Sequence, residues 1–330
     1  MKFLLPTFLL ILFSCSKKEN TEDEYNSKER WTVDSSLIKG ELELFELMND
    51  PQFKYPSEIT KLNDDDLVAV ISFNDEVRVY PYYYTNYYEV VNDVFFDKKI
   101  AISYCPITKT AICFDREINN VVYDVIASGY LYKDNMVASD TNLNLYWSQI
   151  LMTIIRGENI DKELNHYNLI EMKWKTIVDF FPNSKVFYHN KISNKTSNEK
   201  KNKTASTDNI YGISNKNNRT NEEIIELYSF DSFNIITKII TKIYNNKQLL
   251  IIGNTEKSFI TSYYQKDNLE FYLLNDVNFP NILKDNEGNV WNIFGFAVEG
   301  QRKGEQLESP KAFAGQFWAW NSFYQHLNLN

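Results

Sequence analysis

Short runs of apolar residues, many of them alternating with polar ones, recur along most of the chain and indicate β-structure. Residues 67–73 and 77–80 are two such runs around the turn-forming residues 74–76, which predicts a hairpin. Pro81 ends the second run. Residues 82–91 carry a helical pattern instead. Further short apolar runs are predicted to be strands: 100–104, 111–114 and 121–127.

A clear helix signal lies near the middle of the chain, at residues 174–181. Large apolar side chains recur there at the spacing i, i+3, i+4 and i+7, which places them on one helical face: Trp174, Ile177, Val178 and Phe181. Pro182 ends the pattern. Residues 190–221 are rich in Asn, Lys, Ser and Thr and nearly free of apolar side chains. We therefore expect a disordered linker there.

The chain repeats itself on either side of this linker. Residues of matching type recur with intervals that agree within one residue: Asp140, Trp147, Gly157, Leu164, Trp174, Ile177 and Phe180, then Asp285, Trp291, Gly300, Leu307, Phe317, Trp320 and Phe323. Residues 100–116 can be laid on residues 249–265 in the same way. Coincidence among abundant aromatic residues is the alternative. We predict an α+β, mainly β fold with two pseudo-repeated lobes, 37–189 and 222–330, each closed by an aromatic helix.

Composition supports this fold class and excludes some partners. Aromatic residues make up 15% of the chain, which suits half-buried sheet surfaces. The net charge of −9 argues against nucleic acid as a partner and against a polybasic hold on anionic lipid. The three Cys and three His residues show no CxxC or HExxH spacing, so we do not expect a structural zinc site.

The first fifteen residues predict where the protein works. Lys2 precedes an apolar run at residues 3–13, which suits a signal sequence and is shorter than the roughly 20 residues of a transmembrane helix. The run ends in Leu-Phe-Ser-Cys, which resembles the lipobox of bacterial lipoproteins. We expect residues 1–15 to be a signal peptide, a lipid on Cys15, and a flexible tether over residues 16–36.

Such an anchor would hold the globular part at the cell envelope, outside the cytoplasm. Ser16, directly after the cysteine, resembles the residue at this position in lipoproteins of the outer membrane of diderm bacteria. Either face of that membrane is compatible with the sequence. An ordinary cleaved signal with an incidental cysteine is the alternative.

Several short motifs occur in a fixed order: Glu89-Val-Val-Asn92-Asp93, Tyr104-Cys105-Pro106, Phe114-Asp115-Arg116, the segment 128–135, Asp140-Thr141 and Trp147-Ser148-Gln149. Together they resemble the uncharacterised bacterial family catalogued as domain of unknown function 3179, over about residues 64–187. Residues 317–323 resemble the C-terminal end of that family. The resemblance implies no established activity and no cofactor. Many members have a second cysteine where this chain has Thr108, which weakens a metal or dithiol role here.

Cys105 is the candidate nucleophile or redox thiol. A neighbouring positive charge, from Arg116 or Lys109, would lower the pKa of the thiol and activate it. Two other interpretations stay open. Cys105 could be a small buried core residue. It could also form a disulfide with Cys113, although a simple hairpin places Cys105 opposite Ile112, one residue away from Cys113.

The remaining candidates are ligand-binding residues: Asn92, Asp93, Tyr104, Asp115, Asp140, Trp147 and Gln149. The carboxylates could transfer protons, or they could satisfy turn backbone. Trp147 beside a hydroxyl and an amide suits a sugar-like ring, whereas the matching Trp291 favours a core role. Two main function classes result: an envelope lipoprotein that binds a small molecule or glycan, and a cysteine-dependent enzyme. Metal handling through Cys105 and nearby carboxylates is a third, with a thin set of ligands.

Overall fold

The chain folds into mainly antiparallel sheets arranged in two halves, with a parallel pairing of β4 (Glu76–Pro81) and β16 (Lys185–Tyr188). The computed structural model describes residues 30–191, 209–216, 220, 222–266, 268–325, 327 and 329. Strands account for 49% and helices for 12% of the chain, which confirms the α+β, mainly β prediction. The predicted signal sequence and the lipid-bearing Cys15 lie outside the described residues.

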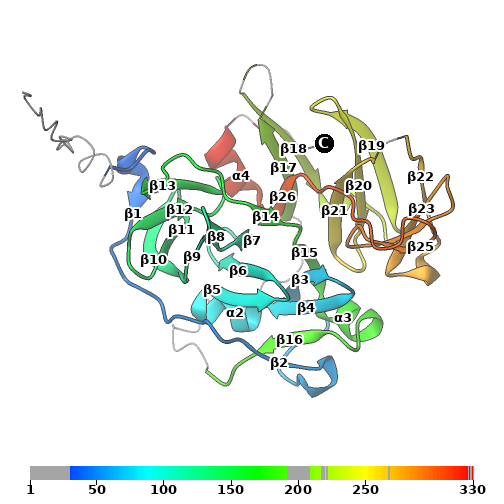
Figure 1. Ribbon diagram of the computed structural model, residues 1–330, viewed down its shortest axis with the longest axis horizontal. Coiled ribbons are helices and arrows are strands. Elements are labelled where there is room, and N and C mark those ends of the chain that lie inside the picture. The colour runs from blue at the N-terminus through cyan, green and yellow to red at the C-terminus, as the bar shows by residue number, and fades with distance from the viewer. Residues whose placement is uncertain are drawn as a thin grey trace, which may run out of the picture.

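Three sheets and a small hairpin build the first half, residues 30–191 (Figure 1). The first sheet has the order β15 (Ile170–Lys173), β3 (Leu67–Phe73), β4 (Glu76–Pro81), β16 (Lys185–Tyr188), β2 (Gln52–Lys54). The second has the order β14 (His166–Tyr167), β7 (Thr110–Asp115), β6 (Lys98–Cys105), β5 (Val90–Phe95). The third has the order β1 (Ile38–Lys39), β10 (Val125–Tyr132), β11 (Asn135–Asp140), β12 (Leu145–Ser148), β13 (Thr153–Gly157). The hairpin is β8 (Glu117–Ile118) and β9 (Val121–Val122), and the helices are α2 (Tyr82–Tyr88) and α3 (Trp174–Phe180).

The second half, from residue 209 onward, repeats this plan. Its sheets are β26 (Lys311–Gln316), β17 (Asn209–Lys216), β18 (Glu223–Ser229); then β19 (Lys238–Tyr244), β20 (Lys247–Asn254), β21 (Phe259–Tyr264); then β22 (Phe271–Leu273), β23 (Asn281–Asp285), β24 (Val290–Asn292), β25 (Ala297–Glu299). The helix α4 (Phe317–Tyr324) follows. Short 3-10 turns complete the chain: Ser35–Leu37, Pro56–Glu58, Phe230–Ser232 and Asp276–Asn278.

The irregularities of the sheets repeat as well. The register shifts directly before the matching tryptophan in each half, between Tyr146 and Trp147 and between Val290 and Trp291. The strand pairs that residues 100–116 and 249–265 predicted are also equivalent, β6 with β7 and β20 with β21. The predicted internal repeat is therefore confirmed at the level of strand pairing.

The linker predicted for residues 190–221 is wrong for residues 209–216. These residues form β17, which lies between β18 and β26, and Ile210, Tyr211 and Ile213 are buried. The strand has only a few apolar residues and the rest of the segment is polar, so the composition of the whole segment did not reveal it. Pairing on both edges and burial on both faces stabilise the strand. The second half thus begins at residue 209 and not at 222. Residues 192–208 lie outside the described residues.

The flexible tether predicted for residues 16–36 is wrong from residue 30 onward. Trp31 packs edge-on against Tyr130 and Tyr146, with ring centroids 5.7 and 5.4 Å apart. Thr32 donates a backbone hydrogen bond to Ile155 O (2.9 Å). One aromatic side chain thus attaches this polar stretch to the third sheet, because burial of a large ring outweighs the ordering of a few residues.

The helix of each half packs against the other half. In α4, Trp320 joins the core cluster that contains Phe114 and Trp147 of the first half. At the end of α3, Phe180 and Phe181 contact Phe279 of the second half, with ring centroids 4.8 and 6.0 Å apart. The predicted lobes are therefore not separate bodies, because each aromatic helix covers its neighbour.

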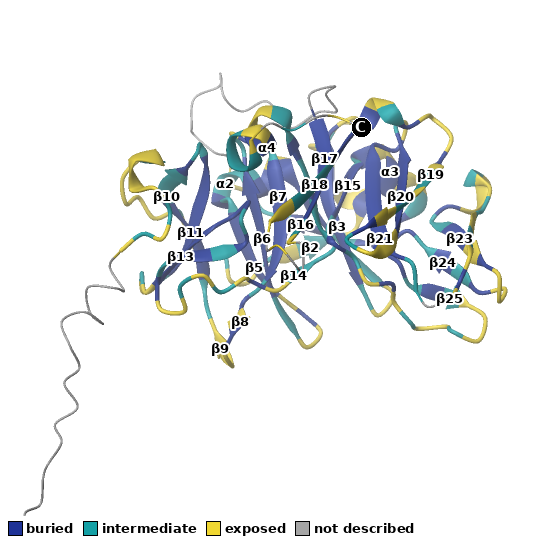
Figure 2. Ribbon diagram, turned by 90° about the horizontal axis from the view of Figure 1, so that it is seen from above, coloured by how far each residue is buried: buried dark blue, intermediate teal, exposed yellow. Residues whose placement is uncertain are grey.

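Two equivalent backbone hydrogen bonds join the halves in the same way. Gln316 N, at the end of β26, donates to Thr108 O in the turn between β6 and β7 (3.0 Å). Lys173 N, at the end of β15, donates to Lys257 O in the matching turn of the second half (3.1 Å). Figure 2 shows the buried strands continuing from one half into the other. No helix in the described parts of the chain is long and apolar enough to cross a bilayer.

Candidate functional site

Cys105 and Arg116 lie at opposite ends of one hairpin. Cys105 is the last residue of β6 and pairs with Thr110, whereas Arg116 follows Asp115, which pairs with Ile100. The Arg116 guanidinium donates to the backbone oxygens of Ile100 (3.1 Å) and Tyr123 (2.8 Å) and to Asp124 Oδ1 (3.1 Å). The prediction that Arg116 activates Cys105 is therefore wrong, because the register separates the two side chains by most of a strand.

The environment of Cys105 is that of a buried core thiol. Its exposed fraction is 1%. Burial raises the pKa of the Cys105 thiol, the Glu89 carboxylate adds to this, and hydrogen bonds with Thr108 oppose it. Cys113 is also a free thiol and belongs to a different core cluster, so the alternative of a Cys105–Cys113 disulfide is wrong as well.

Iodoacetamide should leave Cys105 unmodified in the folded protein near pH 7, because a raised pKa and burial both reduce the accessible thiolate. Peptide mass spectrometry after timed labelling measures this. The control is the same protein in denaturing guanidinium, where Cys105 should react like a free thiol. Native labelling of Cys105 at the rate of a model thiol would contradict the burial described here.

Gln149 is the centre of a buried network of amides and hydroxyls. Its Oε1 accepts from Thr110 Oγ1 (2.7 Å) and Asn135 Nδ2 (2.7 Å), and its Nε2 donates to Ser103 Oγ (2.9 Å). The side chain is fully buried. Gln149 was predicted to bind ligand, but the protein itself satisfies both ends of its amide. Its role in this structure is to join β6, β7 and β11 below the Cys105 turn.

Three other predicted ligand residues also satisfy the protein's own backbone or charges. Asn92 bonds both backbone groups of Val125, donating to its O (2.8 Å) and accepting from its N (3.0 Å). Asp93 Oδ2 accepts from Arg78 Nη1 and Tyr80 Oη, both at 2.5 Å. Asp140 accepts from the backbone of the turn that follows it, as Asp285 does in the second half.

The two predicted aromatic residues are core residues. Tyr104 stacks on Tyr82 with ring centroids 4.3 Å apart, and its exposed fraction is 3%. Trp147 is 1% exposed and packs inside the core, as the matching Trp291 does. Neither ring offers a face to a ligand, so the predicted aromatic platform at Trp147 is wrong.

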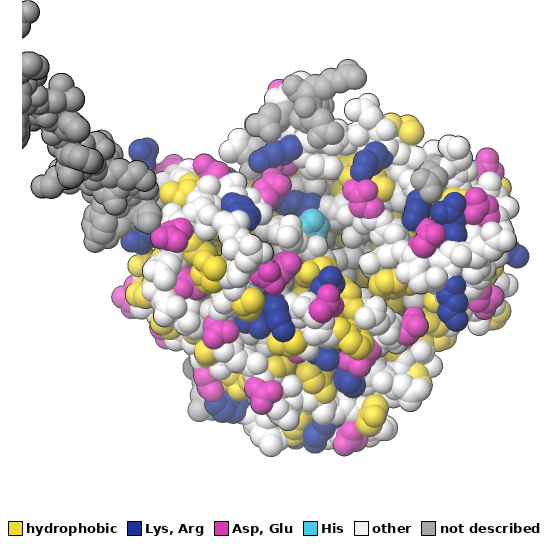
Figure 3. Space-filling model, viewed as in Figure 1, with side chains coloured by type: hydrophobic (Ala, Val, Ile, Leu, Met, Phe, Trp, Pro, Cys, Tyr) yellow, Lys and Arg dark blue, Asp and Glu magenta, His cyan; other side chains and the backbone are white. Residues whose placement is uncertain are grey.

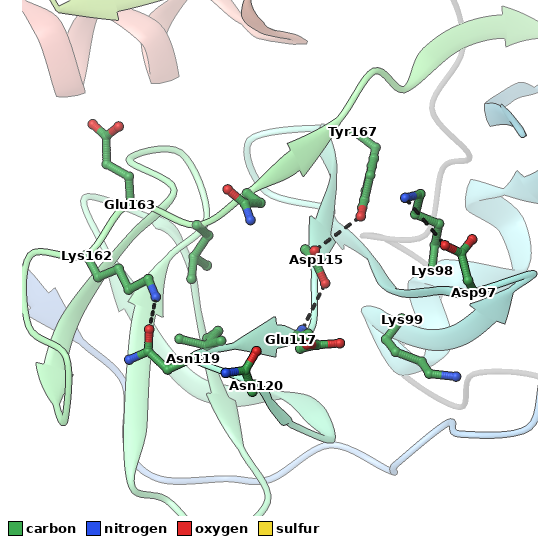
Figure 4. A pocket seen from close by; sticks show the side chains of 13 residues that line it. Asp97, Lys98, Lys99, Asp115, Glu117, Asn119, Asn120, Lys162, Glu163 and Tyr167 are labelled. Atoms are coloured by element: carbon green, nitrogen blue, oxygen red, sulfur yellow. Dashed lines mark hydrogen bonds and ion pairs between the residues drawn. The ribbon is translucent and has the colours of Figure 1, made fainter.

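Asp115 is the predicted site residue that lines a cavity. This cavity, called the polar cavity below, has a volume of about 380 Å³ and lies on the first half (Figure 4). Three segments form its wall: the turn between β5 and β6, the chain that leaves β7, and the chain that enters β14. Its lining residues are Asp97, Lys98, Lys99, Asp115, Glu117, Ile118, Asn119, Asn120, Lys162, Glu163, Leu164, Asn165 and Tyr167.

Short contacts fix part of this wall. Tyr167 Oη donates to Asp115 Oδ2 (3.1 Å), and Glu117 N donates to Asp115 Oδ1 (2.9 Å), so Asp115 holds the aromatic ring beside the cavity (Figure 4). Burial and the Asp115 carboxylate both raise the pKa of Tyr167. The phenol therefore stays protonated and keeps donating at neutral pH.

Other polar groups of the wall are not engaged by the protein. The side chains of Lys99, Glu117, Asn120 and Asn165 make no hydrogen bond or ion pair with the residues that the structure describes. Sequence reasoning missed these positions, because each is an ordinary charged or amide residue of a surface loop. The only sequence signal was the motif Phe114-Asp115-Arg116, which marks one side of the cavity.

The described residues hold no group of three or more His, Cys, Asp and Glu side chains that could hold a metal ion. Comparison with curated proteins and with solved structures finds no match. A family model described as "Protein of unknown function (DUF3179)" matches residues 47–326. That range includes both halves, the polar cavity and α4. The chain therefore belongs to the DUF3179 family.

Proposed function

We propose that this protein is a cell-envelope lipoprotein, anchored by a lipid on Cys15, that binds a polar small molecule or a glycan in the polar cavity. The observation that carries the proposal is the set of unengaged polar side chains around this cavity, Lys99, Glu117, Asn120 and Asn165, next to the Tyr167 ring. A volume of about 380 Å³ is within the range of ligand pockets.

The chemistry of the wall favours a ligand rich in hydroxyl groups. A hydroxyl both donates and accepts, and the wall offers donors at Lys99, acceptors at Glu117, and both at Asn120 and Asn165. Positively charged lysines and negatively charged carboxylates both surround the cavity, so neither a strongly anionic nor a strongly cationic ligand is favoured. Tyr167 supplies an apolar ring against which a sugar face can pack.

A cysteine-dependent enzyme finds less support. The thiol that would act is buried, its pKa is raised, and its expected electrostatic partner Arg116 lies at the other end of the hairpin. Cys105 also lines none of the three largest cavities described for this chain, of about 380, 260 and 230 Å³.

An oligosaccharide panel screened by thermal shift tests the ligand proposal. A binding glycan should raise the melting temperature, since ligand at one hundred times its Kd adds about 2.7 kcal/mol to the native state. Replacing both Lys99 and Asn120 with alanine should abolish the shift. The control Lys303→Ala removes an exposed lysine that does not line the cavity and should keep the shift. A shift that survives the double replacement would place the ligand elsewhere.

The anchor is tested by Cys15→Ala. The wild-type protein should sediment with membranes and carry acyl chains on its N-terminal cysteine, and Cys15→Ala should lose both properties, because acyl chains contribute about 0.8 kcal/mol per buried CH₂. Cys105→Ala is the matched control and should stay in the membrane fraction. Mass spectrometry that finds an unmodified Cys15 thiol, or a leader cut elsewhere, would refute the anchor.

A further inference from the structure

A second cavity, of about 230 Å³, lies between the two halves. The first half contributes Glu163 and His166 to its wall, and the second half contributes Ser214, Lys216 and Lys311. We call it the Lys311 cavity. Glu163 and Leu164 line both this cavity and the polar cavity, so one chain segment separates the two. Figure 3 shows a hollow between the halves, in which a histidine is flanked by acidic and basic side chains.

Lys311 lies where the second half meets the first. It opens β26 and pairs with Ser214 of β17, and its side chain runs toward the first half, where Nζ donates to Leu151 O (2.6 Å). Burial is the main cause that lowers the pKa of Lys311; Glu163 and Glu223 oppose this and Lys216 adds to it. The ammonium is therefore only partly exposed to water, in a wall that faces the cavity.

The ammonium of Lys311 has donors to spare. An ammonium carries three N–H donors, and Lys311 makes one hydrogen bond and no ion pair with the residues that the structure describes. The neighbouring Glu163 carboxylate already pairs with Lys216 at 3.2 Å. A partly buried ammonium with unused donors gains hydrogen bonds when an anion or other acceptors reach it.

We infer that the Lys311 cavity is a binding site for a small carboxylate, which accepts hydrogen bonds from the open donors of Lys311. Charge-assisted N–H···O bonds of this kind are among the strongest that a protein forms. Ser214, from the strand paired with β26, lies in the same wall, and its Oγ is 3.5 Å from Tyr324 Oη. The volume of about 230 Å³ is below the range usual for drug-sized ligands, which favours a ligand the size of an amino acid or a short organic acid.

The Glu223 carboxylate extends this chemistry. It lines the cavity and makes no ion pair with the residues that the structure describes. A ligand with an amino group as well as a carboxylate could thus engage Lys311 and Glu223 together. This site is separate from the polar cavity, so carboxylate binding can fail while glycan binding stands, and the reverse.

Thermal unfolding of the full chain at neutral pH in sodium acetate and in sodium propionate, each against sodium chloride at equal ionic strength, tests the inference. Both carboxylates should raise the melting temperature of the wild type above that in chloride. Lys311→Met, which keeps the chain length and removes the charge, should weaken the apparent affinity at least tenfold. Lys303→Met, the control, removes an exposed lysine that does not line this cavity and should retain it. Equal stabilisation of the wild type and Lys311→Met, or no carboxylate-specific stabilisation of the wild type, would overturn the inference.

A second measurement on the wild type alone keeps the test decisive if Lys311→Met does not fold. Methylammonium chloride replaces acetate at the same concentration. A site built around Lys311 should respond to acetate and not to methylammonium. Equal responses to the two ions would overturn the inference, and so would a response to acetate that grows linearly with concentration, because a binding site saturates and a non-specific salt effect does not.

Discussion

Replacing Trp320 with alanine is expected to lower the free energy of unfolding by about 4 kcal/mol, within the usual range for a large buried aromatic residue. Trp320 has no exposed surface and stacks on Phe313 with ring centroids 4.1 Å apart. Its ring also lies against the backbone of Gly212, where an added Cβ would come within 2.2 Å of it. Alanine would leave a cavity among residues of both halves, because Trp320 of α4 covers the core of the first half.

The same helix provides a matched control. Trp318 lies two residues earlier and is 43% exposed, so Trp318→Ala should change the free energy of unfolding by less than about 1 kcal/mol. Urea unfolding followed by circular dichroism measures both variants. Similar losses for the two variants would mean that α4 contributes by its helical structure alone, and would contradict the packing of Trp320 against the first half.

Replacing Gln149 with leucine should cost about 3 kcal/mol, although leucine fills nearly the same volume. The change leaves Thr110 Oγ1, Asn135 Nδ2 and Ser103 Oγ without their shared partner in a buried place. An unsatisfied buried polar group costs about 1–3 kcal/mol. The loss stays moderate because Asn135 and Thr110 also bond Thr108, and these contacts can remain.

Gln306→Leu is the control for this second prediction. Gln306 is exposed and makes one long hydrogen bond, from Nε2 to Phe294 O (3.3 Å), so its replacement should stay within about 0.5 kcal/mol. Chemical unfolding of both variants with a shared denaturant slope gives the comparison. A Gln149→Leu variant as stable as the wild type would show that this network does not stabilise the fold.

The candidate site illustrates why the motifs of a sequence point less surely to chemistry than to structure. Asn92, Asp93, Asp140, Trp147 and Gln149 sit in the most recognisable motifs, and each is buried with partners from the protein itself or packed in the core. Turn closure, buried ion pairs and core packing demand specific residues at specific positions. The motif residues at these positions therefore stabilise the fold. Of the predicted site residues, Asp115 alone lines the polar cavity.

Local patterns determined much of the architecture. The alternation in residues 67–80, the spacing of Trp174 and Ile177, and the recurrence of Trp147 as Trp291 together predicted hairpins, an aromatic helix and an internal repeat. All three are present. They could be predicted because strand alternation, helical periodicity and repeat spacing depend on neighbours within a few residues, or on one stretch of chain compared with another.

Tertiary structure alone decided the rest. β17 forms within a polar stretch because β18 and β26 pair with both of its edges, and Trp31 orders the polar residues around it by packing on Tyr130 and Tyr146. The contacts of α3 and α4 with residues of the opposite half, and the two cavities beside the segment that leads into β14, arise between residues far apart in sequence. Such contacts leave no periodic pattern in the sequence, because the residues that touch lie far apart in the chain and each fits its local strand or helix whether or not the distant contact forms.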